Sequence, residues 1–250
     1  MKNIEINKLY GLLGKNIDYS FSKDFFSKKF NKENLNCSYM NFDIQEIDEF
    51  KKVINEFKIN GLNVTIPYKE SIIKYLDFVC PIAKKIGAVN TIKFENSTLS
   101  GYNTDYLGFY KSVQRIVKPS TKALILGTGG ASKAVAYALK LLGVKYIFVS
   151  RSKENEECIS YEDLNKSIIN KHKLIINCTP LGTYPMTEEI PKVPISLITS
   201  NHTVYDLIYN PTKSLLLEKS EENGAKIING YQMLQNQAIE SWNIWNRQAK

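Results

Sequence analysis

The stretch LILGTGGASKAVAYAL, residues 124–139, joins a short apolar run to an amphipathic segment through a glycine-rich turn. Gly127 suits a tight turn, and Gly129 would let a phosphate approach the backbone. The helix expected over 130–142 would add free N–H groups and the positive end of its dipole. Because a strand precedes the turn and a helix follows it, the stretch predicts a dinucleotide-binding turn. Ser132 replaces the third glycine of G-x-G-x-x-G, and a plain strand-to-helix connection is the alternative.

Apolar runs and amphipathic segments alternate along the whole chain, which is typical of βαβ units with a parallel sheet. Asn96 marks an expected hairpin, and the Pro119–Ser120 junction is the expected domain boundary. Strands are expected at 10–13, 38–42, 62–66, 89–94, 98–102, 123–126, 146–150, 173–177, 203–207 and 226–228, and helices at 21–30, 44–57, 105–117, 130–142 and 231–247.

Length and composition suit one large or two ordinary α/β domains, with 250 residues of which 43% are hydrophobic. The formal net charge of +8 invites a nucleic-acid interpretation. Only Arg115, Arg151 and Arg247 are arginines, however, and the lysines are spread along the chain. Proteins that recognise nucleic-acid bases favour the planar guanidinium group of arginine. We therefore expect a solvated lysine-rich surface and no nucleic-acid partner.

Cysteine and histidine usage argues against a metal cluster or a disulfide scaffold. The four cysteines form no C-x-x-C pair, and the chain has two histidines. The first residues lack the apolar core of a signal peptide, and no apolar run approaches the roughly 18 residues of a membrane span. We therefore expect a cytoplasmic protein with no metal and no membrane partner.

The end of the strand expected at 146–150 selects the cofactor in such a fold. Sites that bind a ribose 2′-hydroxyl place Asp or Glu there. This chain instead reads Val-Ser-Arg-Ser-Lys over 149–153. Arg151 can stack on adenine and pair with a 2′-phosphate, which favours NADP over NAD. A surface arginine is the alternative, and Glu154 keeps NAD possible.

Four polar clusters follow expected strands in the first half of the chain, at 20–22, 63–69, 90–91 and 103–105. Ligands of α/β sheets bind at the carboxyl ends of strands. Paired hydroxyls can hold a carboxylate, Asn amides can bridge ring hydroxyls, and one Lys with one Asp can share a proton transfer. These residue types together suit a small polyhydroxylated acid.

Each cluster also has a structural alternative. Ser20 or Ser22 could cap a helix, and Asn90 could be a turn residue, as could Asn103 in its own cluster. Lys69 could be one of the many surface lysines, and the aspartate of the last cluster could be a helix cap. Their joint occurrence in a chain with a nucleotide turn favours a binding site.

Several motifs match one known family in order along the chain. They are YGLLG at 10–14, SFS at 20–22, GLNVTIPYKE at 61–70, GAVNTI at 87–92, GYNTDYLGF at 101–109, GTGGAS at 127–132, INCTPLG at 176–182, DLIYNP at 206–211 and GYQMLQNQA at 230–238. On these motifs the chain resembles the shikimate dehydrogenase family over nearly its full length.

The resemblance implies an α/β protein of two domains. Residues 1–119 would form an α/β substrate-binding and catalytic domain, 120–229 a Rossmann-type NADP domain, and 230–250 a terminal helix that returns to the first domain. The implied activity is the reversible NADPH-dependent reduction of 3-dehydroshikimate to shikimate, in aromatic amino-acid biosynthesis. The protein would be a monomer or a homodimer.

The resemblance also implies roles for individual residues. On the substrate side, Ser20 and Ser22 would bind the carboxylate, Thr65 would add a hydroxyl contact, Lys69 and Asp105 would form the catalytic pair, and Asn90, Gln237 and Tyr209 would contact substrate. On the cofactor side, the implied residues are Gly127, Gly129, Gly130 and Ala131 at the pyrophosphate, Ser150, Arg151, Ser152 and Lys153 at the adenosine, and Leu207, Tyr209 and Gly230 beside the nicotinamide.

The chain departs from the family pattern at several positions. Tyr19 stands for the usual His, Lys23 for the usual Pro, and Gln232 for the usual Gly, while Asn155 falls where a second basic residue is usual. An NAD-dependent quinate/shikimate dehydrogenase and a catalytically silent nucleotide-binding regulator are the alternative functions. Retention of the Lys and Asp of the implied pair favours an enzyme.

Overall fold

The computed structural model describes residues 8–17, 20–152 and 157–247, and the chain divides into two compact units. Unit 1 comprises Met1–Thr104 and Ala238–Lys250, and unit 2 comprises Asp105–Gln237. The boundary between the units lies between Thr104 and Asp105. The boundary predicted from the sequence lies later in the chain, at Pro119–Ser120. The assignment of substrate and cofactor to separate domains stays a prediction.

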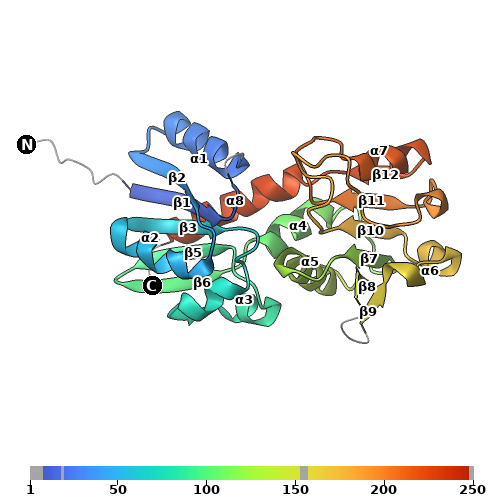
Figure 1. Cartoon of the computed structure of the whole chain (residues 1–250), viewed down its shortest axis with the longest axis horizontal. Helices are drawn as coiled ribbons and strands as arrows, with labels where there is room; N and C mark the ends of the chain where they lie inside the picture. The colour runs from blue at the N-terminus through green and yellow to red at the C-terminus, as the bar shows by residue number, and fades with distance from the viewer. Residues whose placement is uncertain (1–7, 18–19, 153–156, 248–250) are drawn as a thin grey trace, which may run out of the picture. The chain divides into compact units, whose positions relative to one another are not determined.

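Unit 1 is built on a mixed six-stranded sheet in the order β2-β1-β3-β5-β6-β4 (Figure 1). β1 pairs in parallel with β2 and β3, β5 pairs antiparallel with β3, and β5 and β6 form an antiparallel hairpin. Asn96 and Ser97 turn the predicted hairpin with positive φ values of 50° and 61°, which suits a tight two-residue turn. The strands are β1 (Lys8–Gly14), β2 (Cys37–Asp43), β3 (Ile59–Val64), β4 (Phe78–Val79), β5 (Thr91–Glu95) and β6 (Thr98–Tyr102).

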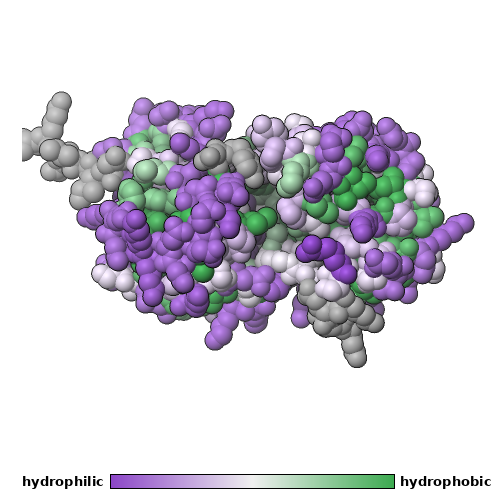
Figure 2. Space-filling view, in the orientation of Figure 1, coloured by the Kyte–Doolittle hydropathy of each residue, from purple (hydrophilic) through white to green (hydrophobic). Residues whose placement is uncertain are grey.

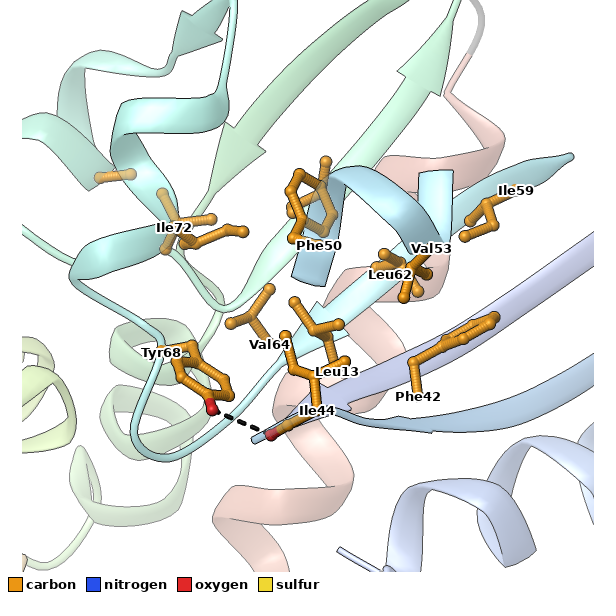
Figure 3. Close-up of a cluster of buried hydrophobic side chains, with 13 residues drawn as sticks. Leu13, Phe42, Ile44, Phe50, Val53, Ile59, Leu62, Val64, Tyr68 and Ile72 are labelled. Atoms are coloured by element: carbon orange, nitrogen blue, oxygen red, sulfur yellow. Dashed lines mark hydrogen bonds between the residues drawn. The ribbon is translucent and has the colours of Figure 1, made fainter. Parts of the chain in front are cut away.

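One face of this sheet carries an aliphatic core (Figure 3). Phe50 and Val53 of α2 (Phe50–Glu56) face Leu62 and its neighbours on β1 and β3. Two further elements, η2 (Ser71–Tyr75) and α3 (Pro81–Ile86), contribute side chains to the same cluster. Pro81 at the first helical turn and Gly87 at φ 75° begin and end α3 in the expected way.

The other face of the sheet carries an aromatic core that includes a tryptophan of the terminal helix. Tyr10 of β1 stacks on Trp245 with ring centroids 4.8 Å apart. Phe26 of α1 (Phe21–Lys32) belongs to the same cluster and packs against Trp245, with ring centroids 5.3 Å apart. Trp245 belongs to α8 (Tyr231–Asn246), and its Nε1 donates to the Ile92 carbonyl at 3.0 Å. The expected return of the terminal helix to the first domain is therefore confirmed.

Unit 2 is a six-stranded sheet in the order β12-β11-β10-β7-β8-β9, with every pairing parallel. This arrangement confirms the predicted Rossmann-type α/β layout. The strands are β7 (Lys122–Leu126), β8 (Lys145–Ser150), β9 (Cys158–Ser160), β10 (Leu174–Asn177), β11 (Thr203–Asp206) and β12 (Lys226–Ile228). The helices are α4 (Asp105–Val113), α5 (Gly130–Leu141), α6 (Lys166–Lys171) and α7 (Leu215–Glu222).

The helix predicted over 44–57 is partly wrong, because its first residues extend from β2 and two separate helical elements follow them. The backbone N–H of Ile44 donates to the Gly14 carbonyl at 2.9 Å, which continues the strand pairing. Glu46 and Glu49 then form a capping box around the short 3₁₀ helix η1 (Ile47–Glu49), and only α2 after it is α-helical. The short elements α3, α6, α7, β4 and β9 were not predicted, since each is too short to show a clear period.

The visible face of unit 1 is mostly hydrophilic over α2 and its surroundings (Figure 2). Within the described ranges, no helix is long and apolar enough to cross a membrane.

Candidate active site

The two serines of the first polar cluster lie at the start of α1. Ser20 is its N-cap residue, and the Ser20 Oγ accepts from the Ser22 N–H at 3.1 Å, so the helix-cap alternative is correct for Ser20. Ser22 is buried, and it forms a hydrogen bond with the phenol of Tyr39. Burial raises the pKa of Tyr39, which keeps this phenol protonated. A carboxylate-binding role for both serines stays a prediction.

The loop after β3 carries Thr65 and Lys69 and is held at several points. The Thr65 N–H donates to the Leu13 carbonyl at 2.9 Å, and the Lys69 carbonyl accepts from the Val89 N–H at 2.7 Å. The Tyr68 hydroxyl donates to the Ile44 carbonyl at 2.9 Å (Figure 3). The backbone on both sides of Lys69 is therefore fixed, and its side chain is half-buried.

Asn90 lies in a buried network of polar side chains. Its Oδ1 accepts from the Thr104 N–H at 2.7 Å, and its Nδ2 donates to the Thr104 Oγ1 at 2.9 Å. Asn103 next to it donates to the Ala88 carbonyl at 3.0 Å. The structure thus brings the third and fourth polar clusters of the sequence together in unit 1.

Asp105 and Gln237 belong to unit 2, unlike Lys69 and Asn90. Asp105 is the buried first residue of α4, and the buried Gln237 lies on α8. Gly108 lets these two helices pack closely, since a Cβ there would lie 2.6 Å from the Met233 carbonyl oxygen. The pairing of Lys69 with Asp105 stays a prediction.

The glycine-rich turn of unit 2 meets the geometric demands of a phosphate-binding turn. Gly127 has φ 100°, a conformation that favours glycine. Gly129 is the N-cap of α5 with no capping side chain, and among the described residues a Cβ there would meet nothing within 4 Å. The Ser132 Oγ beside the turn is buried and has no hydrogen-bond partner in the same part of the chain. An uncapped helix start and an orphaned hydroxyl suit the pyrophosphate of a dinucleotide, and Gly130 and Ala131 form the first turn of α5.

The end of β8 carries the residues expected at the adenosine. Arg151 is exposed and directly follows the buried Ser150. Burial raises the pKa of the nearby Tyr161 phenol to about 12, and the positive charge of Arg151 opposes part of this rise. The Ser152 N–H donates to the Ser150 Oγ at 3.4 Å. Lys153 lies outside the described residues.

The ends of β10 and β11 carry a buried polar cluster to which the sequence reasoning gave no role. The Asp206 Oδ1 accepts from the Asn177 Nδ2 at 3.0 Å and from the Ile208 N–H at 3.1 Å. Its Oδ2 accepts from the Ser214 hydroxyl at 2.5 Å. All three polar side chains are buried. A signal was present in the sequence, because Asn177 and Asp206 each end a run of apolar strand residues.

This cluster, which comprises Asn177, Asp206 and Ser214, fixes the loop that carries Leu207 and Tyr209. The Leu207 N–H donates to the Asn177 carbonyl at 3.0 Å. A Cβ at Gly230 would lie 1.9 Å from the Leu207 carbonyl oxygen, so only glycine fits there. Leu207 and Tyr209 are half-buried. The structure brings the three predicted nicotinamide-side residues into one loop region of unit 2.

Comparison with known proteins identifies relatives over nearly the whole chain. The family profile described as "Shikimate dehydrogenase substrate binding domain" matches residues 12–92. "Shikimate dehydrogenase (NADP(+))" of Clostridium botulinum is 42% identical over 248 residues, which cover 94% of this chain and 95% of the relative.

Solved structures give the same result. Shikimate dehydrogenase from Aquifex aeolicus superimposes with a TM-score of 0.86 at 38% identity, covering 98% of this chain and 94% of that one. The Thermus thermophilus enzyme, solved with NADP(H) and shikimate, gives a TM-score of 0.85 at 27% identity and covers 96% of this chain and 93% of that one.

Asp206 should make the stability of the protein depend on pH in a defined direction. Burial raises its pKa to about 6, above the roughly 3.9 of an unfolded Asp. Between these values the folded state binds more protons, so the free energy of unfolding falls as pH rises. Asp206→Asn does not titrate, and its amide can donate to Ser214 while its oxygen still accepts. We expect its stability relative to the parent to increase by roughly 2 kcal/mol from pH 4 to pH 7.

Urea unfolding at several pH values measures this difference. Asp206→Ala is the matched comparison, because it also removes the titrating group but leaves the Asn177 and Ile208 donors without an acceptor. It should show the same trend with pH at lower stability throughout. A parent-to-Asn difference that stays constant from pH 4 to pH 7 would contradict the prediction.

Proposed function

Since the chain belongs to the shikimate dehydrogenase family, we propose that Lys69 and Asp105 carry the proton transfer of the family's reaction. The chain is an NADP-dependent oxidoreductase that acts on a CH–OH group. The reaction is the reversible reduction of 3-dehydroshikimate to shikimate with NADPH, a step of aromatic amino-acid biosynthesis. The likeness to shikimate dehydrogenases over 94% of the chain carries this conclusion.

The substrate carboxylate would be held at the start of α1. Ser22 and Ser20 supply hydroxyls beside the helix N-terminus, which favours a negative charge. Thr65 would add a hydroxyl from the loop after β3. Asn90 and, from α8, Gln237 would contact ring hydroxyls of the substrate, and Tyr209 would lie against it. The buried hydrogen bonds around Asn90 support this assignment, since they fix the amide before substrate binds.

Proton transfer must accompany the change between ketone and alcohol. In the direction of reduction, the Lys69 ammonium would polarise the ketone oxygen and donate a proton as negative charge develops there. Asp105 would keep the lysine charged and aligned with that oxygen. In the reverse direction the same lysine would accept the hydroxyl proton.

The residues of unit 2 fit NADP. When bound, the cofactor supplies the hydride chemistry. Gly127, Gly129, Gly130 and Ala131 would hold its pyrophosphate at the start of α5. Arg151, with Ser150, Ser152 and Lys153, would meet the adenosine and its 2′-phosphate. Leu207, Tyr209 and Gly230 would line the nicotinamide, and the Asn177–Asp206–Ser214 cluster would hold their loop in place.

The alternative functions are not favoured by the relatives from Clostridium botulinum and Aquifex aeolicus, which are both named "Shikimate dehydrogenase (NADP(+))" and are matched over 95% and 91% of their length. A cytoplasmic location and a monomeric or homodimeric state stay predictions. Neither affects the chemistry assigned to the residues above.

The direct test is an absorbance assay at the NADPH band. We expect the purified chain to reduce NADP in the presence of shikimate, and to do so more efficiently than it reduces NAD. Quinate in place of shikimate is the control for substrate choice. A chain that binds nucleotide but reduces neither cofactor would support the silent regulator instead.

Lys69→Ala should lower kcat by about 100- to 10,000-fold, the range typical of a lost general acid–base group. Cofactor affinity should not change, because the lysine is assigned to the reacting oxygen and not to NADP. Steady-state kinetics and a titration with NADP measure the two effects. Lys84→Ala, which changes an exposed lysine of α3, is the matched control. If kcat of Lys69→Ala stays within about threefold of the parent, Lys69 is not part of the mechanism.

Arg151→Ala should raise KM for NADP at least tenfold, equivalent to about 1.4 kcal/mol, and leave KM for NAD nearly unchanged. The reason is that a guanidinium pairs with the 2′-phosphate, which NAD lacks. Arg115→Ala is the matched control, since Arg115 is also exposed. Equal losses with both cofactors would mean that Arg151 only stacks on adenine or supports the loop.

A further inference from the structure

Ser241 of α8 lies at the centre of the buried polar network of unit 1 that contains Asn90. The residue is completely buried. Its Oγ lies 2.8 Å from the Asn63 Nδ2, 2.8 Å from the Thr91 Oγ1 and 3.2 Å from the Thr104 Oγ1. One hydroxyl from the terminal helix thus meets polar side chains from β3, from β5 and from the segment before α4.

The directions of the hydrogen bonds around Asn90 follow from which groups can only donate or only accept. The Thr104 N–H donates to one end of the Asn90 carboxamide at 2.7 Å, which identifies that end as the oxygen. The other end is then Nδ2, and it donates to the Thr104 Oγ1 at 2.9 Å. The Thr91 hydroxyl donates to the Asn90 Oδ1 at 3.0 Å. It must therefore accept, and not donate, in its contact with Ser241.

Ser241 closes these bonds into a ring. Asn63 Nδ2 can only donate, so the Ser241 oxygen accepts from it. The Ser241 hydrogen then goes to Thr91, and the single Thr104 hydrogen has two acceptors at 3.2 Å, the Ser241 oxygen and the Asn90 Oδ1. With the Thr104 hydrogen on the Ser241 oxygen, four groups donate in one sense, from Ser241 to Thr91, to Asn90, to Thr104 and back to Ser241. Hydrogen bonds arranged in such a chain polarise and strengthen one another.

The ring determines how Asn90 can meet a ligand. Its Oδ1 already accepts from the Thr104 N–H and the Thr91 hydroxyl, which fills both acceptor positions of a carbonyl oxygen. Any contact with a substrate hydroxyl must therefore come from the Asn90 amide N–H, with the substrate oxygen as the acceptor.

We propose that Ser241 is a positioning residue, which closes the ring and holds Asn90 as a hydrogen-bond donor to a hydroxyl oxygen of the substrate. The proposal rests on the proposed function, in which Asn90 contacts the substrate. Ser241 itself touches neither substrate nor cofactor. Its hydroxyl keeps the Thr91 hydrogen directed at the Asn90 oxygen, and so prevents the carboxamide from reorienting.

Ser241→Ala should raise KM for shikimate by about 3- to 10-fold, the loss expected when a neutral hydrogen bond in the network is removed. Because Ser241 touches no reacting atom, kcat and KM for NADP should stay within about twofold of the parent. The matched control is Ser220→Ala in α7, which removes an equally buried serine hydroxyl bonded to the Leu216 carbonyl. It should leave KM for shikimate unchanged. Ser241→Cys, which nearly keeps the volume but donates weakly, should give an intermediate KM, and serves if the alanine variant does not fold.

A double-mutant cycle with Asn90→Ala separates positioning from a merely structural role. If Ser241 acts through Asn90, Ser241→Ala should add no further rise in KM for shikimate once Asn90 is alanine. An unchanged KM in Ser241→Ala, or the same fold-rise with and without Asn90, would overturn the proposal. Both outcomes are measured against an active parent, so they are distinct from failure of the proposed function, in which the parent itself would not oxidise shikimate.

Discussion

Buried polar side chains at the ends of central strands impose the constraint on which both candidate sites depend. A buried carboxamide or carboxylate is costly unless it is hydrogen-bonded, so each one fixes the segments that satisfy it. Asn63 near the end of β3 bonds the phenol of Tyr39 and the hydroxyl of Ser241. Asp206 at the end of β11 bonds Asn177 and Ser214. The loops that carry the functional residues are held because breaking these hydrogen bonds would leave buried polar groups unsatisfied.

In unit 1 these hydrogen bonds link the first helix, α1, to the terminal helix, α8. Ser22 bonds Tyr39, Tyr39 bonds Asn63, and Asn63 bonds Ser241 of the terminal helix, which closes the ring around Asn90. Ser22, assigned to the substrate carboxylate, and Asn90, assigned to a substrate hydroxyl, are thus joined by one continuous set of hydrogen bonds. Preorganisation of this kind reduces the entropy that must be lost when a small polar ligand binds.

In unit 2 the constraint is combined with close backbone approach. Gly127 turns with a positive φ, and Gly230 admits the Leu207 carbonyl where no Cβ could fit. These two glycines belong to the GTGGAS and GYQMLQNQA motifs, and the structure gives a steric reason for glycine at each position. Asp206 adds a chemical reason for the loop after β11, since its carboxyl accepts from three donors on three different segments.

The sequence alone determined the alternation of strands and helices, the hairpin at Asn96, the glycine-rich turn and the family resemblance, because these depend on local period, turn chemistry and short motifs. It misassigned the start of 44–57, where the Ile44 N–H donates to the carbonyl of Gly14, a residue distant in sequence, and α-helix begins only at Phe50. It gave no role to Ser241 or Asp206. The partners of Ser241 lie 137 to 178 residues away along the chain, and Asn177 lies 29 residues from Asp206. Such hydrogen bonds exist only once packing has brought the segments together. Tertiary structure therefore decided which hydroxyls and carboxyls orient the site residues, since burial makes those bonds obligatory and sequence spacing does not record them.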